Sequence, residues 1–387
     1  MMKKFLSTYH SPLLVIVVGM GLFGLVMVYS ASTYVSFENT GEYYSYGLRQ
    51  GIWWLVAFAA FLLASLFPFT AYKKLLPFIV GITVLLLLLV FIPQLGEERN
   101  SATRWLKIGP ILIQPSEIAK LTVPLYISYI LVQKRTQLHD FKKGIMPSLI
   151  IVLVIAALIL LQPDLGTVIS ILIAYLAMLL VGKIKLKHVI LLGMSGIGAV
   201  ALLAIISPYR LERLTSFSAP FDDPLNGGYQ LIQSLSAISI GGLTGTGLGN
   251  SIMKMGFLPE AHTDFIIAVI AEELGIFGIG AVIIGFFALL LVGYQIFSKC
   301  PHPVGKLLAI GITAQIAGQA CMNLAAAVGL MPITGIPLPL ISYGGASLVI
   351  TMTMLGVLMN VARYTHYQNK LETKETYETT RPFYRTI

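Results

Sequence analysis

The sequence predicts an all-α, polytopic membrane protein with ten transmembrane helices. Of its 387 residues, 56% are hydrophobic and 11% are charged, whereas soluble globular domains carry roughly 25% charged residues. A membrane-spanning helix needs about 20 mostly apolar residues, and apolar runs of about this length recur along the chain. This composition excludes an ordinary soluble enzyme and predicts that apolar surface faces lipid as well as a protein core.

The spans follow from the apolar runs, taken in chain order. They are predicted at 12–34, 48–67, 72–93, 114–132, 145–162, 165–182, 187–207, 263–297, 305–329 and 341–363. The first run is too long for the core of a cleavable signal peptide and lacks a clear small-residue cleavage site, so it is expected to remain as an anchor. Residues 1–363 then form one membrane domain, and the polar tail, 364–387, is expected to be disordered and cytoplasmic.

Lys and Arg are distributed unequally between alternate connections, which sets the predicted orientation. The side that holds the N-terminus carries 18 of them and the opposite side carries seven, so both termini are predicted to be cytoplasmic. The net charge of +9 then reflects topology rather than a nucleic-acid footprint, and no nucleic-acid partner is expected. The two cysteines, Cys300 and Cys321, suit neither a disulfide framework nor a metal cluster.

Two connections on the outer side are candidate functional surfaces because they are long loops on a rigid scaffold. They are 94–113 and the large extracytoplasmic loop 207–262 between the seventh and eighth spans. The large loop contains PFDDPLNGGYQ and GGLTGTGLGNS, whose Pro, Asp and Gly content forbids one continuous helix. Its short amphipathic stretch 230–240 could lie along the membrane surface.

Ionisable residues within or beside the predicted spans are few, and each costs roughly 2.5–3.5 kcal/mol or more at membrane depth. They are Arg104, Glu117, Lys120, Asp164, Glu260, His262, Asp264, Glu272 and Glu273. Such residues tend to face the bundle interior with a partner or water, so each is a candidate site residue. For Glu272 and Glu273, about two turns beyond Asp264, a structural role against polar groups of neighbouring helices is favoured.

The stretch IQPSEIAKL places Glu117 and Lys120 on one face of a helix that begins near Pro115. They could form an internal salt bridge, or Lys120 could bind an anionic headgroup such as pyrophosphate with Arg104 and Arg210. Trp105 could stack on a sugar or serve as an interfacial anchor.

The stretch FLPEAHTDFIIAVIAEELG is the densest polar cluster, and it predicts that Glu260 and Asp264 share one helical face. Asp264 could cap the helix, but Thr263 would do so with less desolvation. The alternative is a general base or a metal ligand in a partly dry cleft. Asp164, which follows Pro163, presents the same choice between helix capping and a site role.

The run MPITGIPLPLISYGGASL interrupts the last apolar region with Pro and Gly, and Ser342 lies at its mouth. Irregular backbone at membrane depth survives only where protein or a water-filled cavity satisfies it. This segment is therefore expected to line a cavity.

These stretches resemble the motifs of the SEDS family (shape, elongation, division and sporulation) of membrane glycosyltransferases, typified by FtsW and RodA. The resemblance covers nearly the whole chain and is carried by LVMVYSAS, ATRWLKIGPILIQPSEIAKL, QPDLGT, DPLNGGYQLIQSL, LPEAHTDFI and PLPLISYGGASL. Through GLGNSIMKMGFLPEAHTDF the chain looks more like FtsW than RodA.

The resemblance implies polymerisation of lipid II into peptidoglycan strands at the outer face of the bacterial cytoplasmic membrane, at the division septum, with release of undecaprenyl pyrophosphate. It implies that Asp264 is required for catalysis, and the expected substrate-binding set comprises Arg104, Trp105, Glu117, Lys120, Asp164, Arg210, Glu260, His262 and Ser342. A divalent cation, Mg²⁺ or Mn²⁺, could be held by Asp264 and substrate phosphates, and no organic cofactor is expected. The implied partners are a class B penicillin-binding protein, which is a transpeptidase, and other division proteins. The main alternative is a lipid II flippase, because ten spans with a broken segment and buried charges also suit alternating access.

Overall fold

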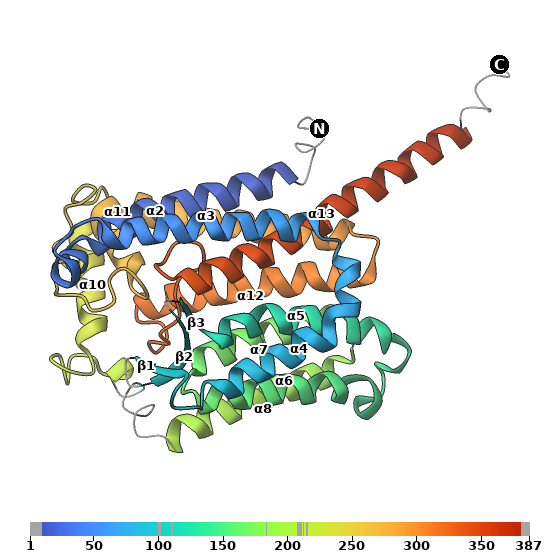
Figure 1. Ribbon diagram of the computed structural model, residues 1–387, viewed down its shortest axis with the longest axis horizontal. Coiled ribbons are helices and arrows are strands. Elements are labelled where there is room, and N and C mark those ends of the chain that lie inside the picture. The colour runs from blue at the N-terminus through green and yellow to red at the C-terminus, as the bar shows by residue number, and fades with distance from the viewer. Residues whose placement is uncertain are drawn as a thin grey trace.

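The computed structural model describes residues 10–99, 102–109, 111–182, 184–206, 211, 213 and 216–380. In this part of the chain, ten helices coincide with the ten predicted apolar runs (Figure 1). They are α2 (His10–Thr40), α3 (Ser45–Leu66), α4 (Tyr72–Leu89), α5 (Pro115–Gln133), α6 (Met146–Leu161), α7 (Leu165–Val181), α8 (Leu186–Ile206), α11 (Ile266–Lys299), α12 (Pro303–Ala327) and α13 (Gly345–Thr380). Short helical turns, η1 (Phe69–Ala71), η2 (Arg135–Gln137) and η3 (Phe141–Ile145), connect some of them.

Seven of the described helices are long and apolar enough to cross a membrane, which makes the chain a multi-pass membrane protein. They are α2, α3, α4, α6, α11, α12 and α13, two of which include an adjoining short turn. Helices α7 and α8 are apolar but contribute shorter runs, Leu165–Val181 and Leu186–Leu202. Helix α5 carries Glu117 and Lys120, and most of its residues are buried in the bundle. Because protein rather than lipid surrounds α5, it tolerates polar residues that a lipid-facing helix would not.

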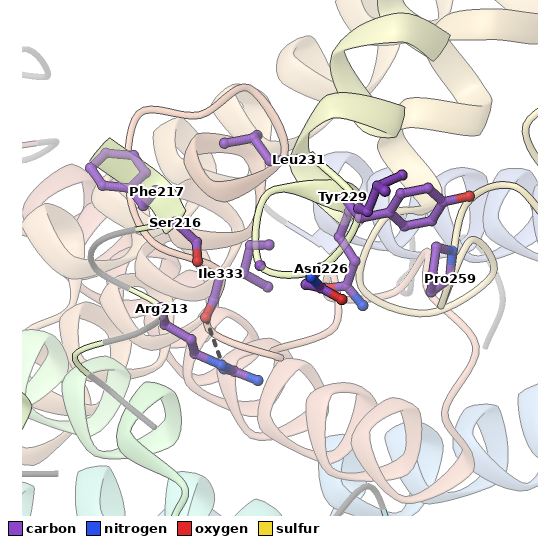
Figure 2. Close-up of a pocket in the computed structure, with 11 residues that line it drawn as sticks. Arg213, Ser216, Phe217, Asn226, Tyr229, Leu231, Pro259 and Ile333 are labelled. Atoms are coloured by element: carbon purple, nitrogen blue, oxygen red, sulfur yellow. Dashed lines mark hydrogen bonds between the residues drawn. The ribbon is translucent and has the colours of Figure 1, made fainter. Parts of the chain in front are cut away.

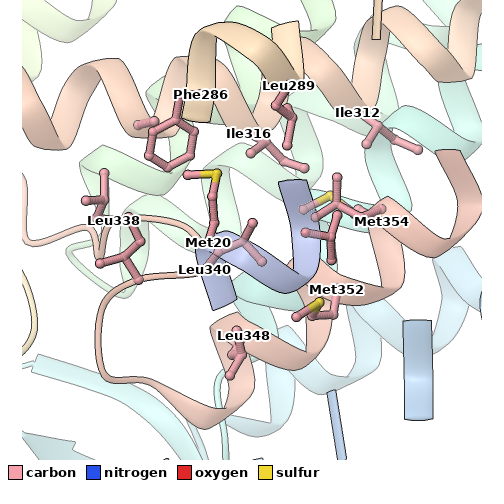
Figure 3. Close-up of a cluster of buried hydrophobic side chains, with 14 of the residues drawn as sticks. Met20, Phe286, Leu289, Ile312, Ile316, Leu338, Leu340, Leu348, Met352 and Met354 are labelled. Carbon is pink, nitrogen blue, oxygen red and sulfur yellow. The ribbon is translucent and has the colours of Figure 1, made fainter. Parts of the chain in front are cut away.

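Two clusters of buried apolar side chains hold the described helices together. The larger cluster joins α2, α3, α11, α12 and α13, and Figure 3 shows Met20, Phe286, Ile312 and Met352 converging within it. The smaller cluster lies mainly among α5, α6 and α7. The segment between α12 and α13 also contributes Leu338 to the larger cluster, so this irregular backbone is buried in protein.

The all-α prediction is wrong for the connection between α4 and α5. Within the described residues it forms a three-stranded antiparallel sheet in the order β1 (Gly96–Arg99), β2 (Ala102–Ile108), β3 (Ile111–Ile113). β-Branched and aromatic residues favour strands here, Thr103, Trp105 and Ile108 in β2 and Ile111 and Ile113 in β3, and Gly109 supplies a positive φ of 60° between β2 and β3. Successive strand side chains point to opposite faces, so Arg104 and Trp105 do not share a face of β2.

The C-terminal tail also differs from its prediction, because α13 continues as a helix to Thr380. Disorder was expected from residue 364 onwards. The stretch THYQNKLETKETYETT contains neither Gly nor Pro, so no helix breaker follows the apolar part of α13.

The predicted short amphipathic helix is confirmed as α10 (Tyr229–Gly241), but it packs on protein. Its buried positions include Leu231, Ser234 and Ala237. The Ser234 hydroxyl donates to the carbonyl of Ala327 over 2.7 Å, and Gly241 lies so close to Ala271 of α11 that a Cβ would collide with its carbonyl. The apolar face of α10 is therefore covered by neighbouring helices and is not available to rest on a membrane surface.

Helix α11 is interrupted at Gly275, whose φ of 62° and ψ of −152° are not helical. The interruption separates a short buried piece, 266–274, from the long piece that follows. Backbone groups around the break pair with the preceding loop: Thr246 N donates to Glu272 O over 2.9 Å, and Gly247 N donates to Glu273 O over 3.0 Å. These bonds satisfy carbonyls that the broken helix leaves without their usual partners.

Candidate active site

The segments that carry the polar candidates meet at one end of the bundle, where α10 and the strands β1–β3 lie (Figure 1). We call this the site end. It is opposite the end from which the last turns of α13 project. Four segments meet here: β2, the start of α7, the turn 259–265 before α11, and the connection 328–344 between α12 and α13.

The turn 259–265 is irregular, so the prediction that Glu260 and Asp264 share a helical face is wrong. Helix α11 begins only at Ile266, and Glu260 has a φ of 55°, in the left-handed region. The carbonyl of Glu260 accepts from Thr263 N and Phe265 N over 3.1 and 3.2 Å, and its carboxylate accepts from the Thr263 hydroxyl over 2.5 Å. The Thr263 side chain is therefore engaged in hydrogen bonds within the turn. The Asp264 carboxylate takes no part in these bonds.

The backbone of Asp264 is tied to α12 and to the connection that follows it. The Asn323 amide donates to Asp264 O over 2.7 Å and to Ile336 O over 2.8 Å. The Asp264 Oδ2 atom lies 3.7 Å from the point that a Cβ on Gly335 would occupy. The partly buried carboxylate is thus positioned against a glycine that presents no side chain of its own.

The environment of Asp264 raises the pKa of its carboxyl to about 7. Burial is the largest cause, the charge of Glu260 adds to it, and Asp164 adds less. The guanidinium groups of Arg213 and Arg104 act in the opposite direction. A carboxyl group with a pKa near the working pH can both accept and release a proton, which suits a general base.

His262 belongs to an aromatic group beside this turn. Its ring meets Tyr46 edge-on with centroids 5.3 Å apart, and the Tyr343 ring is 5.4 Å away. His262 is 8% exposed, and burial lowers its pKa, partly offset by Glu260. A lowered pKa favours the neutral imidazole, in which one ring nitrogen can donate a hydrogen bond and the other can accept one.

Ser342 holds the connection 328–344 against the turn 259–265. Its hydroxyl donates to Thr263 O over 2.6 Å and accepts from Leu338 N over 2.8 Å, and Tyr343 N donates to His262 O over 2.9 Å. Because Ser342 is 5% exposed and engaged on both sides, the structure places it as a support for the turn.

Arg104 and Asp164 organise the start of α7. The Arg104 Nε atom donates to Gln162 O over 3.0 Å, and a second guanidinium nitrogen donates to Pro163 O. The Asp164 carboxylate accepts from Thr167 N over 3.2 Å and from the Ser116 hydroxyl over 3.1 Å. The capping interpretation of Asp164 is therefore correct, and its charge also reaches Asp264.

Glu117 and Lys120 form the internal salt bridge that the sequence allowed. Lys120 Nζ lies 2.6 Å from Glu117 Oε2 and donates to Gln319 Oε1 over 2.8 Å, and Lys120 is 0% exposed. Gln319 in turn donates to Pro337 O over 2.8 Å. This chain of contacts links α5 through α12 to the connection that packs against Asp264, and Lys120 is buried within it.

Sequence reasoning missed three residues that this geometry brings in. Arg213 acts on Asp264 although only Arg210 was predicted, and Arg210 itself lies outside the described residues. Gln319 and Asn323 do not stand out among the ionisable residues, because their side chains are neutral amides. The available signal was three amides four residues apart, Gln315, Gln319 and Asn323, in a mainly apolar run, since a buried polar group must find a partner.

Trp105 is half-buried on β2, on the face opposite Arg104, with Glu97 of β1 as its strand partner.

The candidate metal ligand Asp264 is not part of a larger ligand set. No group of three or more His, Cys, Asp or Glu side chains in the described ranges is arranged to hold a metal ion. A divalent ion at Asp264 would need most of its ligands from substrate phosphates and water, as Mg²⁺ often has.

Comparisons with known proteins agree with this architecture. A family model described as "Cell cycle protein", named for FtsW, RodA and SpoVE, matches residues 11–367. The chain is 40% identical over 378 residues to the probable peptidoglycan glycosyltransferase FtsW of Pseudoalteromonas translucida, covering 96% of this chain and 93% of that protein. It is also 40% identical over 387 residues to the probable peptidoglycan glycosyltransferase FtsW of Bacillus subtilis, covering 97% and 96%.

The fold is also similar to a chain of a solved peptidoglycan synthase complex, reported for its structural coordination of polymerization and crosslinking. The TM-score is 0.75 at 28% identity, and the match covers 92% of this chain and 98% of that one.

Proposed function

Because the chain belongs to the FtsW, RodA and SpoVE family of cell cycle proteins, we propose that it is a peptidoglycan glycosyltransferase that polymerises lipid II. Its FtsW-named relatives and its match over nearly the whole chain support this reaction class. In this proposal ten helices span the bacterial cytoplasmic membrane, both termini are cytoplasmic, and the site end faces outwards with the loop 207–262.

The observation that carries the proposal is the Asp264 carboxyl with its pKa near 7, flanked by cations at the site end. Asp264 takes the proton from the C4 hydroxyl of the acceptor N-acetylglucosamine as that oxygen bonds to C1 of the donor N-acetylmuramic acid. The bond between C1 and the pyrophosphate oxygen breaks with inversion from α to β. The proton then passes from Asp264 to water, which readies the carboxylate for another cycle.

The leaving pyrophosphate needs charge stabilisation rather than a general acid. Arg104 and Arg213 are the described cations whose fields reach Asp264. Arg104 is proposed to bind the pyrophosphate, with Arg210 as a further candidate, and Arg213 is proposed to hold the connection 328–344 through its hydrogen bond to Ile333 O. A divalent ion bound by Asp264 and the phosphates would supply additional positive charge to the departing group. Lys120 is proposed to influence the site without touching the pyrophosphate, because its ammonium group is buried against Glu117 and Gln319.

The remaining predicted residues divide between contact and support. Glu260 and His262 lie on the turn that carries Asp264 and are proposed to orient the acceptor sugar, and Trp105 is proposed to border the sugar path. Asp164 and Ser342 are proposed as positioning residues, since their hydrogen bonds hold the start of α7 and the turn 259–265.

A crosslinking partner is part of the proposal. The similar solved structure couples polymerization with crosslinking in one complex, which supports a class B penicillin-binding protein as the transpeptidase that acts on the strands made here. The "Cell cycle protein" description of the family supports septal synthesis with other division proteins.

The test uses the purified protein with its penicillin-binding partner in liposomes containing labelled lipid II, with the transpeptidase inhibited. Wild type is expected to form glycan strands, and Asp264→Asn to lose at least a factor of about 10²–10⁴, the usual contribution of a general base. Asp222→Asn, an exposed Asp in the 207–262 loop, is the matched control. Strands from Asp264→Asn at the wild-type rate would refute the base, and lipid II crossing the bilayer without any strands would favour the flippase.

A further inference from the structure

A pocket of about 350 Å³ opens beside the Asp264 turn, between α10 and the connection after α12. Figure 2 shows Tyr229, Asn226 and Pro259 on one side of it and Arg213 bonded to the carbonyl of Ile333 on the other. Ligand pockets usually measure about 300–1,000 Å³. This one is large enough for one sugar ring and too small for a long oligosaccharide.

The pocket adjoins the reacting centre. Pro259 directly precedes Glu260, and Ile333 is two residues from Gly335, against which the Asp264 carboxylate lies. Arg213, on the pocket wall, is near enough to Asp264 for its charge to act on that carboxyl. A chain of sugars with its reacting end at Asp264 could therefore continue into this pocket.

The lining suits a neutral sugar better than a pyrophosphate. It combines the amides of Asn226 and Gln230 with the ring of Tyr229 and apolar side chains, a combination that offers hydrogen bonds and a flat apolar face. Arg213 contributes the cation, and its guanidinium already donates to Ile333 O over 2.9 Å.

Residues at the N-terminus of α10 also line the pocket, but a carboxylate is already present there. Asp223 accepts from Gly227 N over 3.3 Å and from the Asn226 amide over 3.0 Å. A second anion would be repelled at this position, although a helix N-terminus alone would favour one.

We propose that this pocket binds an N-acetylhexosamine ring of the growing glycan strand, beyond the disaccharide that reacts at Asp264. The inference rests on the proposed polymerase function and adds to it a subsite that favours elongation over initiation. A donor of four sugars fills the pocket, whereas lipid II, with two, does not reach it. Successive additions then occur on a strand that stays bound.

The test compares two donors for the full-length protein with its inhibited transpeptidase partner: lipid II itself and a preformed lipid-linked tetrasaccharide. Wild type is expected to use the tetrasaccharide faster. In Tyr229→Ala and Gln230→Ala this preference should fall by roughly five- to tenfold, the effect of losing one stacking or hydrogen-bonding contact, and mean strand length should shorten. Tyr229→Phe, which keeps the ring, should retain most of the preference.

Tyr44→Ala is the matched control, because Tyr44 is an exposed tyrosine outside the pocket, and it should leave the preference unchanged. An equal loss with both donors in Tyr229→Ala would mean that the residue only supports the fold, and an unchanged preference would mean that no sugar binds there. Either result overturns the subsite while polymerisation by wild type persists. Absence of polymerisation by wild type would instead overturn the proposed function itself.

Discussion

Lys254 Nζ lies 2.7 Å from Glu273 Oε1, and the two side chains are 3% and 0% exposed. The Ser30 hydroxyl donates to the same carboxylate over 2.7 Å. This ion pair joins α2, the loop before Asp264 and the short first piece of α11. It also confirms the expected structural role of Glu273 against a neighbouring helix.

Lys254→Met should destabilise the protein by about 3–5 kcal/mol, because it leaves a buried carboxylate without its partner. The double variant Lys254→Met/Glu273→Gln should recover part of this loss, since no unpaired charge remains. Unfolding of the detergent-solubilised protein measures both. A single variant as stable as wild type would show that the pair is not needed for the fold.

Gly275→Ala should disrupt the break in α11. Its φ of 62° strains any residue with a side chain, at about 1–3 kcal/mol, and a Cβ would also collide with the backbone of Leu243 and Gly245. Gly280→Ala is the control, because nothing lies within 4 Å of its Cβ position. A lower unfolding temperature is expected for Gly275→Ala alone, and equal stability of the two variants would contradict the tight packing at the break.

The structural and the pyrophosphate-binding interpretations of Lys120 predict different results for a double variant. If Lys120 is structural, Lys120→Met should lower the free energy of unfolding by about 3–5 kcal/mol, because Glu117 is left buried without its partner. Adding Glu117→Leu should then restore stability and part of the polymerisation rate. If Lys120 binds pyrophosphate, the double variant should be stable but should still use lipid II poorly. Because Lys120 and Glu117 are buried and 2.6 Å apart, we expect the result of a structural role. The KM for lipid II, measured together with stability, distinguishes the two interpretations.

The pH dependence of polymerisation should report the Asp264 carboxyl. A general base works when deprotonated, so the rate should rise with pH and level off above the pKa of about 7. Glu260→Gln removes a like charge that raises the pKa of Asp264, so the rising limb should move to lower pH. Arg213→Gln removes a cation that lowers that pKa, so the limb should move to higher pH.

Lys107→Gln, at an exposed side chain of β2, is the control, because Lys107 is not among the charges that act on this carboxyl. Coincident profiles for all four proteins would exclude Asp264 as the titrating base.

The helices were predictable because the apolar run is a local property of the chain. Each of the ten runs became a helix, although the ends shifted: α2 continues to Thr40 rather than residue 34, and α13 to Thr380. The sheet was not foreseen, because its strands are short and stabilise each other only by pairing. The break at Gly275 was not foreseen, although Glu272 and Glu273 precede it directly. Its backbone groups pair with loop residues 242–247, and the apolar pattern gives no sign of that distant loop.

The sequence indicated which residues belong to the candidate site better than how they are arranged in space. Asp264 stood out because a carboxylate beside an apolar run needs a reason to be there. Its relation to Glu260 was wrongly predicted as helical, because a positive φ at Glu260 is imposed by the hydrogen bonds of the folded turn.

The sequence by itself determined that this is a multi-pass membrane protein, which family it resembles, and which carboxylate deserves the catalytic role in the proposal. Only the tertiary structure decided which polar groups share a site. Asn323 and Asp264 are 59 residues apart, and Lys120 and Gln319 are 199 apart, yet each pair is joined by a hydrogen bond. Hydrophobic periodicity predicts which face of a helix is buried. It does not predict which residue lies across the interface, because that contact forms only when helices distant in the sequence pack together.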